Sequence, residues 1–436
     1  KKQDQLQKLL STQFTDYQIY QVETHALNAY VKEKKTEIHL RLQFGSQYSW
    51  EMQLLDNDIR SPEYKVQVAT ETGVIAYPRG ENKSFMAFPN HELGRVRLTI
   101  DDEFIYGFVE EGGETYYIEP LWYFDKKAAT DLFVVYAASD VIPDKTKTCG
   151  LDHDHSVHEK KHHDLPDVVK PGVGNPPLAE MMTCFDVEIA IASDWLMWQD
   201  YGGMANLENR NIGVMNAVQA DYDDEFNWEL NYVIVTQFFS SCSTCDPWTA
   251  STAAGTLLGS FRSWGNGGGF GVTYDVAQLW TDRNYNGSTV GIAYLSGVCN
   301  FNRYHANQDY TGNANSIRQL TSHELGHNFG SGHDAGGSPC IMAPAINGSS
   351  CWSAASQNVI NNFTSGLING CLAPCSAGVA PTALFSADVT DGCVPLTVNY
   401  FDASLGATSW SWTFEGGTPA TSTDQNPTVT YLTQGV

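Results

Sequence analysis

The sequence predicts a multidomain fold in which a β-rich N-terminal domain precedes a central part of alternating strands and helices and a strand-rich C-terminal part. The 436 residues are too many for one hydrophobic core, and a typical domain of about 150 residues suggests about two to four domains. At Cys184 the pattern changes from strand-like runs to alternating strands and helices. After Cys375 it returns to short strand-like runs with turn residues.

The N-terminal domain covers residues 1–150. Strand-like runs recur at residues 38–44, 66–69, 95–100 and 114–118, with turns between them. None of these runs holds a set of side chains suited to catalysis. The domain ends in the sequence Lys147-Thr148-Cys149-Gly150.

Residues 151–179 form a predicted linker. They hold several Pro and Gly residues and five histidines, namely His153, His155, His158, His162 and His163. A tract with so few apolar side chains cannot pack, so we expect it to be exposed. The alternative interpretation of the histidine run is metal binding.

Residues 180–376 form the central domain. Residues 187–192 and 232–236 are predicted buried strands, and residues 212–218 have helical spacing. We interpret residues 276–280 as the approach to a third strand at residues 290–295. Small side chains in this strand would let a peptide backbone approach its edge, which is made by Gly291, Ile292, Ala293, Tyr294 and Leu295.

The most specific motif of the chain begins at His323. His323 and His327 lie four residues apart, so both reach one side of a helix and can bind the same Zn²⁺. Gly330 suits the left-handed conformation that ends a helix, and the turn it allows brings His333 in as a third ligand. Glu324 lies beside the metal. Three protein ligands with one open position are typical of a catalytic zinc site, so the motif predicts a zinc hydrolase.

Charge and cysteine usage restrict the class of protein. A net charge of −25 argues against nucleic acid and anionic membranes as partners, and no apolar run of about 18 residues predicts a membrane span. Ten cysteines, many near the histidines, fit disulfides in an oxidising compartment; a structural zinc built from cysteine pairs is the alternative. The N-terminus lacks both an initiator Met and an apolar segment, which suggests a removed signal or trimming. We expect an exported protein.

The central domain resembles the adamalysin (reprolysin, ADAM-like) branch of the metzincin endopeptidases. The zinc motif ends in His333-Asp334, as in that branch, and residues 340–344 resemble its Met-turn. Residues 274–279 and 291–299 resemble the segments that precede its zinc helix. The resemblance implies an α/β catalytic domain with a twisted mixed sheet, most of it parallel, whose edge strand faces the cleft.

The resemblance also implies an activity. Zinc-activated water would attack peptide bonds of protein or peptide substrates, with Glu324 as general base and Met342 as an apolar floor beneath the zinc. Substrates would bind extended along residues 291–295. The predicted function is therefore a secreted zinc-dependent endopeptidase. The alternative is a catalytically silent adhesion or binding protein on the same scaffold, but the complete motif favours the enzyme.

The sequence around Cys149 resembles the cysteine switch of metalloprotease propeptides. By this resemblance residues 1–150 are a propeptide that inhibits its own enzyme, with the Cys149 thiolate in the fourth zinc position. The alternative is that Cys149 forms a disulfide. Under the switch interpretation the protein is a latent zymogen, and the cut that activates it falls between Lys160 and Ala179.

The same family implies further sites. The implied disulfides are Cys184–Cys375, Cys242–Cys245, Cys299–Cys371 and Cys340–Cys351, which leave Cys149 and Cys393 unpaired. Glu188 and Asp275 match two of the family's calcium ligands, although no Asn follows Cys371 at the expected place. Carbonyl oxygens and waters would complete the roughly six to eight oxygens that Ca²⁺ takes, and a plain pair of acids is the alternative.

Strand-like runs recur at residues 385–387, 392–398, 410–414 and 426–431. With these runs, residues 377–436 resemble part of a polycystic-kidney-disease (PKD) domain, which is an immunoglobulin-like β-sandwich. About 60 residues are short for a sandwich, so we expect the chain to stop inside this domain. Trp410 and Trp412 would either bind insoluble protein or polysaccharide or belong to the core of the sandwich. Because such modules follow catalytic domains in many exported bacterial proteases, the resemblance suggests a bacterial source.

Overall fold

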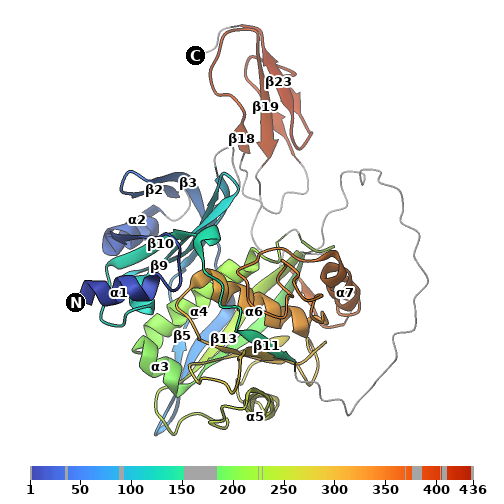
Figure 1. Cartoon of the computed structure of the whole chain (residues 1–436). Helices are drawn as coiled ribbons and strands as arrows, with labels where there is room; N and C mark the ends of the chain where they lie inside the picture. Colours follow the sequence, from blue (N-terminus) through green and yellow to red (C-terminus); the bar gives the residue numbers. More distant parts are fainter. Residues whose placement is uncertain are drawn as a thin grey trace.

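The computed structural model describes residues 2–34, 38–87, 93–151, 184–223, 225–227, 229–368, 370–375, 385–402, 404 and 410–433. The predicted linker, with its five histidines and the expected cut between Lys160 and Ala179, lies outside these residues apart from residue 151. Figure 1 shows two large sheets packed together, with a small C-terminal group of strands apart from them. No helix among the described residues is long and apolar enough to cross a membrane.

The N-terminal region is dominated by an eight-stranded sheet whose neighbouring strands are all antiparallel. Its order is β1-β10-β9-β8-β7-β6-β3-β2. The elements of this region are α1 (Lys2–Leu10), β1 (Gln18–Gln21), α2 (Thr24–Lys34), β2 (Ile38–Phe44), β3 (Tyr48–Asp56), β4 (Arg60–Thr70), β5 (Gly73–Pro78), β6 (Ser84–Ala87), β7 (Leu93–Asp101), β8 (Phe104–Glu111), β9 (Glu114–Pro120), η1 (Leu121–Tyr123), β10 (Leu132–Ala137), η2 (Ala138–Asp140) and β11 (Thr148–Leu151). The predicted strand at residues 38–44 is β2, and its strict alternation of buried and exposed residues follows from having one face on the core.

The second sheet contains the strands that follow residue 184. Its order is β11-β15-β16-β14-β12-β13-β4-β5, with β17 paired to β12. The elements are β12 (Cys184–Ser193), α3 (Trp195–Tyr201), α4 (Met204–Gln219), β13 (Glu229–Ser240), α5 (Ala254–Asn266), β14 (Val276–Thr281), β15 (Thr289–Ala293), β16 (Tyr304–Gln308), α6 (Ala314–Asn328), α7 (Ala354–Ser365) and β17 (Ala373–Pro374). Strands β12, β13, β14 and β16 pair in parallel, whereas β15 is antiparallel to β16. The sheet is therefore mixed and mostly parallel.

Two sequence predictions about this sheet were wrong in detail. Residues 276–280 are not an approach to the third strand, because they form strand β14 in the middle of the sheet. Strand β16 went unrecognised, since buried polar residues such as His305 and Asn307 interrupt its apolar pattern. The edge strand β15 also ends at Ala293, so Tyr294 and Leu295 follow it rather than belong to it.

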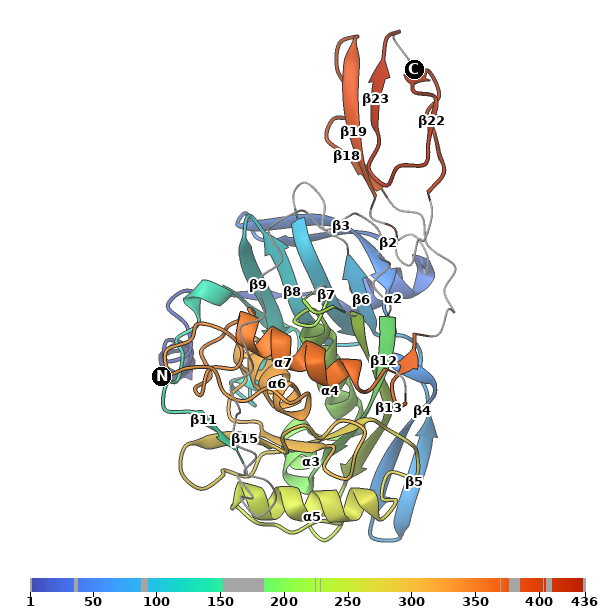
Figure 2. The ribbon, with the colours of Figure 1, turned by 90° about the vertical axis from the view of Figure 1, so that its right-hand side faces the viewer.

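The N-terminal region supplies three strands to this second sheet. Strands β4 and β5 extend it beyond β13, and β11 extends it beyond β15 (Figure 2). Both edges of the strands that follow residue 184 are thus covered by strands from before residue 152. The expected boundary at residue 150 divides the chain, but it does not divide this sheet.

Helices cover both faces of the second sheet. Helix α4 packs between it and the N-terminal sheet, in contact with β7, β8 and β13, and α6 lies on the same side, whereas α5 covers the opposite face (Figure 2). Side chains along β12 point alternately to the two faces of the sheet, which explains why both faces are covered. Ile189 and Ile191 face the α4 side, and Ala190 and Ala192 face α5.

The structure contains four disulfides, which are the pairs that the family resemblance implied: Cys184–Cys375, Cys242–Cys245, Cys299–Cys371 and Cys340–Cys351. Two cysteines are free, namely the buried Cys149 and the exposed Cys393. Eight cysteines paired in this way leave no thiolates among them for the alternative structural zinc site.

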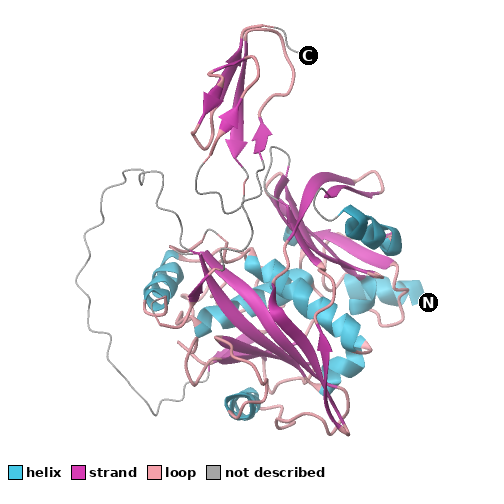
Figure 3. Ribbon diagram, turned by 180° about the vertical axis from the view of Figure 1, so that it is seen from behind, coloured by secondary structure: helices cyan, strands magenta, loops and turns pink. Residues whose placement is uncertain are grey.

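The C-terminal residues form two small sheets (Figure 3). Their strands are β18 (Phe385–Ala387), β19 (Leu396–Asp402), β20 (Trp412–Thr413), β21 (Gly417–Thr418), β22 (Thr421–Ser422) and β23 (Thr428–Tyr431). The ring of Trp412 lies 5.4 to 6.0 Å from the rings of Phe385, Tyr400 and Phe414. Trp412 therefore belongs to an aromatic cluster, as the core alternative expects, while Trp410 is half-buried.

Candidate metal centre

Helix α6 carries the predicted metal ligands in the interior of the protein. Its N-terminus is capped by Asn313, whose side chain accepts a hydrogen bond from the Ser316 amide at 3.0 Å. All of its residues except Ser316 are buried. The helix ends before Phe329, and Gly330 has φ +93°, the left-handed conformation predicted for this glycine.

Four potential ligands meet at one point. One ligand atom from each of Cys149, His323, His327 and His333 lies within 4.8 Å of the others. The three imidazole rings are 4.6 to 5.1 Å apart, and Cys149 Sγ lies 3.4 Å from His327 Nε2. The fold thus brings the three histidines together with Cys149, although Cys149 and His333 are 184 residues apart in sequence.

The surroundings of the histidines suit a bound zinc ion. His323 Nδ1 donates to Ile341 O and His327 Nδ1 donates to Ser331 O, each at 2.7 Å, which directs both Nε2 lone pairs to the centre. Burial lowers the pKa of His323 to about 4, so its ring is neutral at physiological pH. Its Nε2 is buried and has no hydrogen-bond partner within the described part of the chain. Such an atom fits a metal ligand better than a packed core histidine.

Glu324 lies next to this cluster and is fully buried. Burial raises the pKa of its carboxyl group to about 8. A hydrogen bond from the Cys149 side chain lowers this pKa in part, and the two carboxylate oxygens have no other partner among the described residues. A Cβ added to Gly291 of strand β15 would overlap Glu324 Oε1 and lie 2.6 Å from Leu320 Cδ1, so the carboxylate occupies space that only glycine leaves open.

The predicted Met-turn lies directly below the metal helix. Met342 is fully buried, and a Cβ on Gly326 would lie 2.6 Å from its sulfur. Asp334, the residue after the third histidine, ties this turn in place. Its amide donates to Met342 O at 2.9 Å, and its carboxylate accepts from Ser338, Ser353 and Ser356.

A short segment that we call the strap, residues 142–151, crosses the site. Its strand β11 pairs in parallel with β15, with Cys149 opposite Gly291. On the other side, Cys149 N donates to Pro344 O and Ile346 N donates to Lys147 O, both at 3.3 Å. The strap therefore occupies residues 291–293 of the edge that was predicted to bind substrate at residues 291–295.

Three residues that contact the start of the metal helix, or each other beside it, were not found by sequence analysis. Glu119 accepts hydrogen bonds from Tyr136 Oη at 2.5 Å and from the Ala314 amide at 3.1 Å. Tyr117 Oη donates to Asn315 Oδ1 at 3.1 Å. All three come from the N-terminal sheet, and nothing in their local sequence indicates a partner almost 200 residues away.

The predicted calcium ligands Glu188 and Asp275 are neighbours in the structure. Asp275 Oδ2 accepts from the Glu188 amide at 2.9 Å. Burial, followed by the charges of Glu188 and Asp186, raises the pKa of Asp275 to about 6. Its other oxygen lies against the sulfurs of the Cys299–Cys371 disulfide, which are not available as thiolate ligands.

Comparison with known proteins agrees with the geometry of the site. Residues 185–366 match the Reprolysin_5 model, metallo-peptidase family M12. A zinc metalloproteinase-disintegrin-like protein of Cerberus rynchops is 28% identical over 248 residues, which are 55% of this chain and 37% of that protein. The zinc metalloproteinase-disintegrin-like atrase-A of Naja atra is 26% identical over 254 residues, 55% of this chain and 39% of that protein.

The chain thus spans less than two fifths of the length of these curated relatives. Among solved structures, metalloproteinase-II from Bacteroides fragilis aligns with a TM-score of 0.45 and 13% identity, over 77% of this chain and 94% of that one. The matched segment contains His323, Glu324, His327, His333 and Met342. Over residues 185–366 the chain therefore matches a reprolysin-type metallopeptidase domain of family M12.

Proposed function

We propose that this protein is a zinc endopeptidase made as a latent zymogen. The observation that carries the proposal is the convergence of His323, His327, His333 and Cys149 on one point, beside the buried carboxylate of Glu324. Three histidines suit a catalytic zinc, and the cysteine is a fourth ligand that would exclude water. The family match over residues 185–366 supports peptide bonds as the substrate.

The three histidines would hold the zinc. When bound, zinc supplies a Lewis acid that polarises the scissile carbonyl and makes a water molecule more acidic. Glu324 Oε takes the proton of the attacking water and passes it to the leaving amine. Once β11 has left, the edge of β15 binds the substrate backbone as an added strand, with Gly291 next to Glu324. Met342, which packs below the helix, and the contacts of Asp334 hold the loop that carries His333 in place against the helix.

Latency follows from the position of the strap. The strap holds the β15 edge with its backbone and the fourth ligand position with Cys149. A substrate needs both places, so it cannot bind while the strap is there. The N-terminal region acts in this proposal as the inhibitor of its own enzyme.

The finer parts of the proposal concern location and accessory sites. Export to an oxidising compartment is supported by the four disulfides, and a bacterial source by the PKD resemblance. Calcium at Glu188 and Asp275 is supported by their position side by side and by their raised pKa values, which burial causes first and neighbouring carboxylates increase, because a bound cation would offset both costs. The C-terminal domain would bind insoluble protein or polysaccharide.

The test of the enzyme is hydrolysis of casein by the activated full chain. Glu324→Gln should lower kcat by roughly a hundredfold to ten-thousandfold while zinc stays bound, because it removes the base and keeps the shape. Glu71→Gln changes an exposed carboxylate in the β4–β5 turn and is the matched control. Chelation should abolish hydrolysis and added zinc should restore it. Equal rates for both variants would end the proposal, and no hydrolysis by a zinc-loaded chain would favour the silent binding protein.

A further inference from the structure

The N-terminal region contacts the metallopeptidase domain through two surfaces of very different size. We propose that residues 2–141 remain docked as a permanent subunit of the active protein, and that activation removes only the strap, residues 142–151. The removal takes two cuts, one in the linker between Lys160 and Ala179 and one at residues 142–147, in the exposed loop or just after it. The part concerning activation rests on the proposed function, whereas the docking does not.

Docking begins with strand β4, which is built into the central sheet. Six of its residues pair in parallel with β13 along Ile234 to Ser240. Tyr64, Val66 and Val68 of β4 are at most 4% exposed. Loss of this strand would leave a long apolar edge on β13, which soluble proteins avoid because such edges aggregate.

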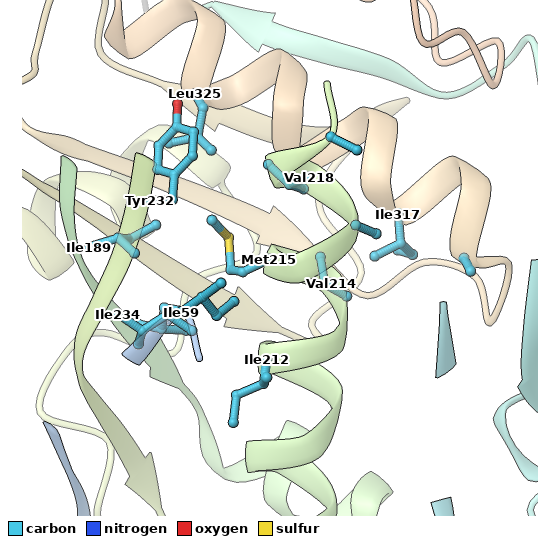
Figure 4. Close-up of a cluster of buried hydrophobic side chains, with 14 of the residues drawn as sticks. Ile59, Ile189, Ile212, Val214, Met215, Val218, Tyr232, Ile234, Ile317 and Leu325 are labelled. Atoms are coloured by element: carbon cyan, nitrogen blue, oxygen red, sulfur yellow. The ribbon is translucent and has the colours of Figure 1, made fainter. Parts of the chain in front are cut away.

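The two regions share one hydrophobic core. A single cluster contains Ile59, Tyr106 and Val134 from the N-terminal region together with Ile189, Met215 and Leu325 from the metallopeptidase domain. Figure 4 shows Ile59 among Ile189, Ile234 and Met215. A core that is continuous across the boundary is typical of obligate interfaces and not of a segment that is discarded.

Helix α4 is shaped for the N-terminal sheet. Every residue from Leu207 to Gln219 is buried. Gly213 lies in the interior of this helix, where glycine weakens the helix, and a Cβ there would lie 2.7 Å from the Tyr106 ring. Gly213 makes room for the N-terminal sheet. If the metallopeptidase domain lost that sheet on activation, this glycine would only weaken the helix.

Polar groups on α4 also depend on the N-terminal region. Asn216 Nδ2 donates to Phe85 O and Leu98 O at 3.3 and 3.1 Å, and its Oδ1 accepts from Asn57 at 3.0 Å. Asn216 is 1% exposed.

Charges across this surface have opposite signs. Lys83, Lys126 and Arg97 lie on the N-terminal side, and they pair with Glu208 at 3.0 Å, with Asp200 at 2.6 Å and with Asp223.

The strap is a much weaker attachment. It makes a four-residue strand, and residues 142 and 144–146 are exposed. Lys145 lies in this exposed loop and Lys147 just beyond it, so a trypsin-like protease could separate the strap from residues 2–141 without unfolding the sheet. With the linker also cut, the described contacts of the peptide that carries Cys149 are with residues 288–293, with residues 344–346 and, through its sulfur, with His327, so this short peptide can dissociate.

The test is limited trypsin digestion of the full chain, followed by size exclusion, mass spectrometry and casein hydrolysis. We expect an N-terminal fragment that ends at Lys145 or Lys147 to co-elute with the metallopeptidase fragment, and hydrolysis to appear in that two-chain peak. The double variant Lys145→Gln/Lys147→Gln, cut only in the linker, should stay latent. Fragments that separate under native conditions, or a two-chain peak that becomes active only after losing residues 2–141, would overturn the proposal.

A matched pair of variants tests the docking surface itself. Asn216→Ala should weaken the two-chain complex by at least about tenfold, since it removes three hydrogen bonds across the surface. Asn211→Ala, in the same helix and equally buried, loses bonds to Ser193 and Gln237 within its own domain and should leave the affinity unchanged. Equal affinities for the two variants would count against this surface as the anchor. If neither Cys149→Ser nor trypsin produces hydrolysis in any peak, the proposed function fails while co-elution still decides the docking.

Discussion

Strands β4 and β11 come from the same N-terminal region and extend opposite edges of one sheet, yet they have different roles. Strand β4 has eleven residues, and its Tyr64, Val66 and Val68 are buried in a core that both regions share. Strand β11 has four, and what distinguishes it is the single contact of Cys149 with the histidine cluster. Under the proposal, anchoring and inhibition are therefore separate: a large surface would fix the N-terminal region, and a small exposed strap would block the site.

This separation has an energetic reason. Buried apolar area stabilises the β4 surface along its whole length. The loss of one apolar contact there should therefore change the affinity of docking only slightly. At the strap most of the specificity lies in one side chain, because backbone pairs over four residues are weak alone. Inhibition should therefore depend mainly on one residue, Cys149. Docking should depend on many residues, each with a smaller effect.

The largest effect is expected for Cys149→Ser in the uncut chain. Loss of the thiolate should raise casein hydrolysis by on the order of a hundredfold to a thousandfold, since breaking one buried charged contact costs about 3 to 5 kcal/mol. Elution as a single folded chain should not change. Cys393→Ser, at the exposed free cysteine, is the control and should have no effect. If both variants remain as latent as the parent, the strap does not inhibit through its sulfur.

Sequence analysis predicted the local parts of the site well. The spacing of His323, His327 and His333 predicted that their rings meet, because they follow one helix and one turn, and Gly330 was recognised by the conformation that this turn requires. Strand β2 was equally clear, since one of its faces meets the solvent. These features depend on residues that are close in sequence.

The non-local parts could not be predicted. An apolar run such as β4 indicates a strand but not which sheet it joins, and here it joins β13, about 170 residues away. Strand β16 carries His305 and Asn307 in the core, where the hydrogen bond that His305 Nδ1 donates to Asn328 Oδ1 compensates for the polarity of His305. Glu119 resembles any strand carboxylate until Ala314 is placed beside it.

A smaller effect is expected from pH at the docked surface. Burial raises the pKa of Glu119 to about 8 from an ordinary value of 4.5, and the nearby charge of Asp309 acts in the same direction. The folded state therefore prefers the protonated acid. Its stability is full below about pH 4.5 and falls as the pH rises towards 8, by about 2 kcal/mol or more.

Glu119→Gln should remove most of this loss, because the amide oxygen still accepts from Tyr136 and Ala314 but carries no charge. The measurement is the denaturant midpoint of the uncut chain at pH 5 and pH 8 for both proteins. Other buried acids titrate in both proteins, so the difference between them isolates Glu119. Parallel pH profiles would mean that Glu119 is already ionised at pH 5, and latency should be the same in both proteins.

The smallest effect is expected for Gly291→Ala, which should change catalysis without changing docking. The new Cβ would overlap Glu324 Oε1 and crowd Leu320, so the base must move aside. Overpacking of at least about 1.4 kcal/mol predicts a kcat roughly tenfold lower in the activated protein, with zinc content and two-chain elution unchanged. Gly259→Ala is the matched control, because its nearest neighbour, Tyr294 Oη, is 3.8 Å away.

A second substitution identifies the cause. Glu324→Asp is shorter by one methylene, so Gly291→Ala should cost less kcat in that background than in the parent, and the double-mutant cycle measures the difference. If the cost is the same in both backgrounds, the alanine acts on the pairing of β15 with the substrate and not on Glu324. The explanation that alanine crowds Glu324 would then be wrong, although the edge strand would keep its role in substrate binding.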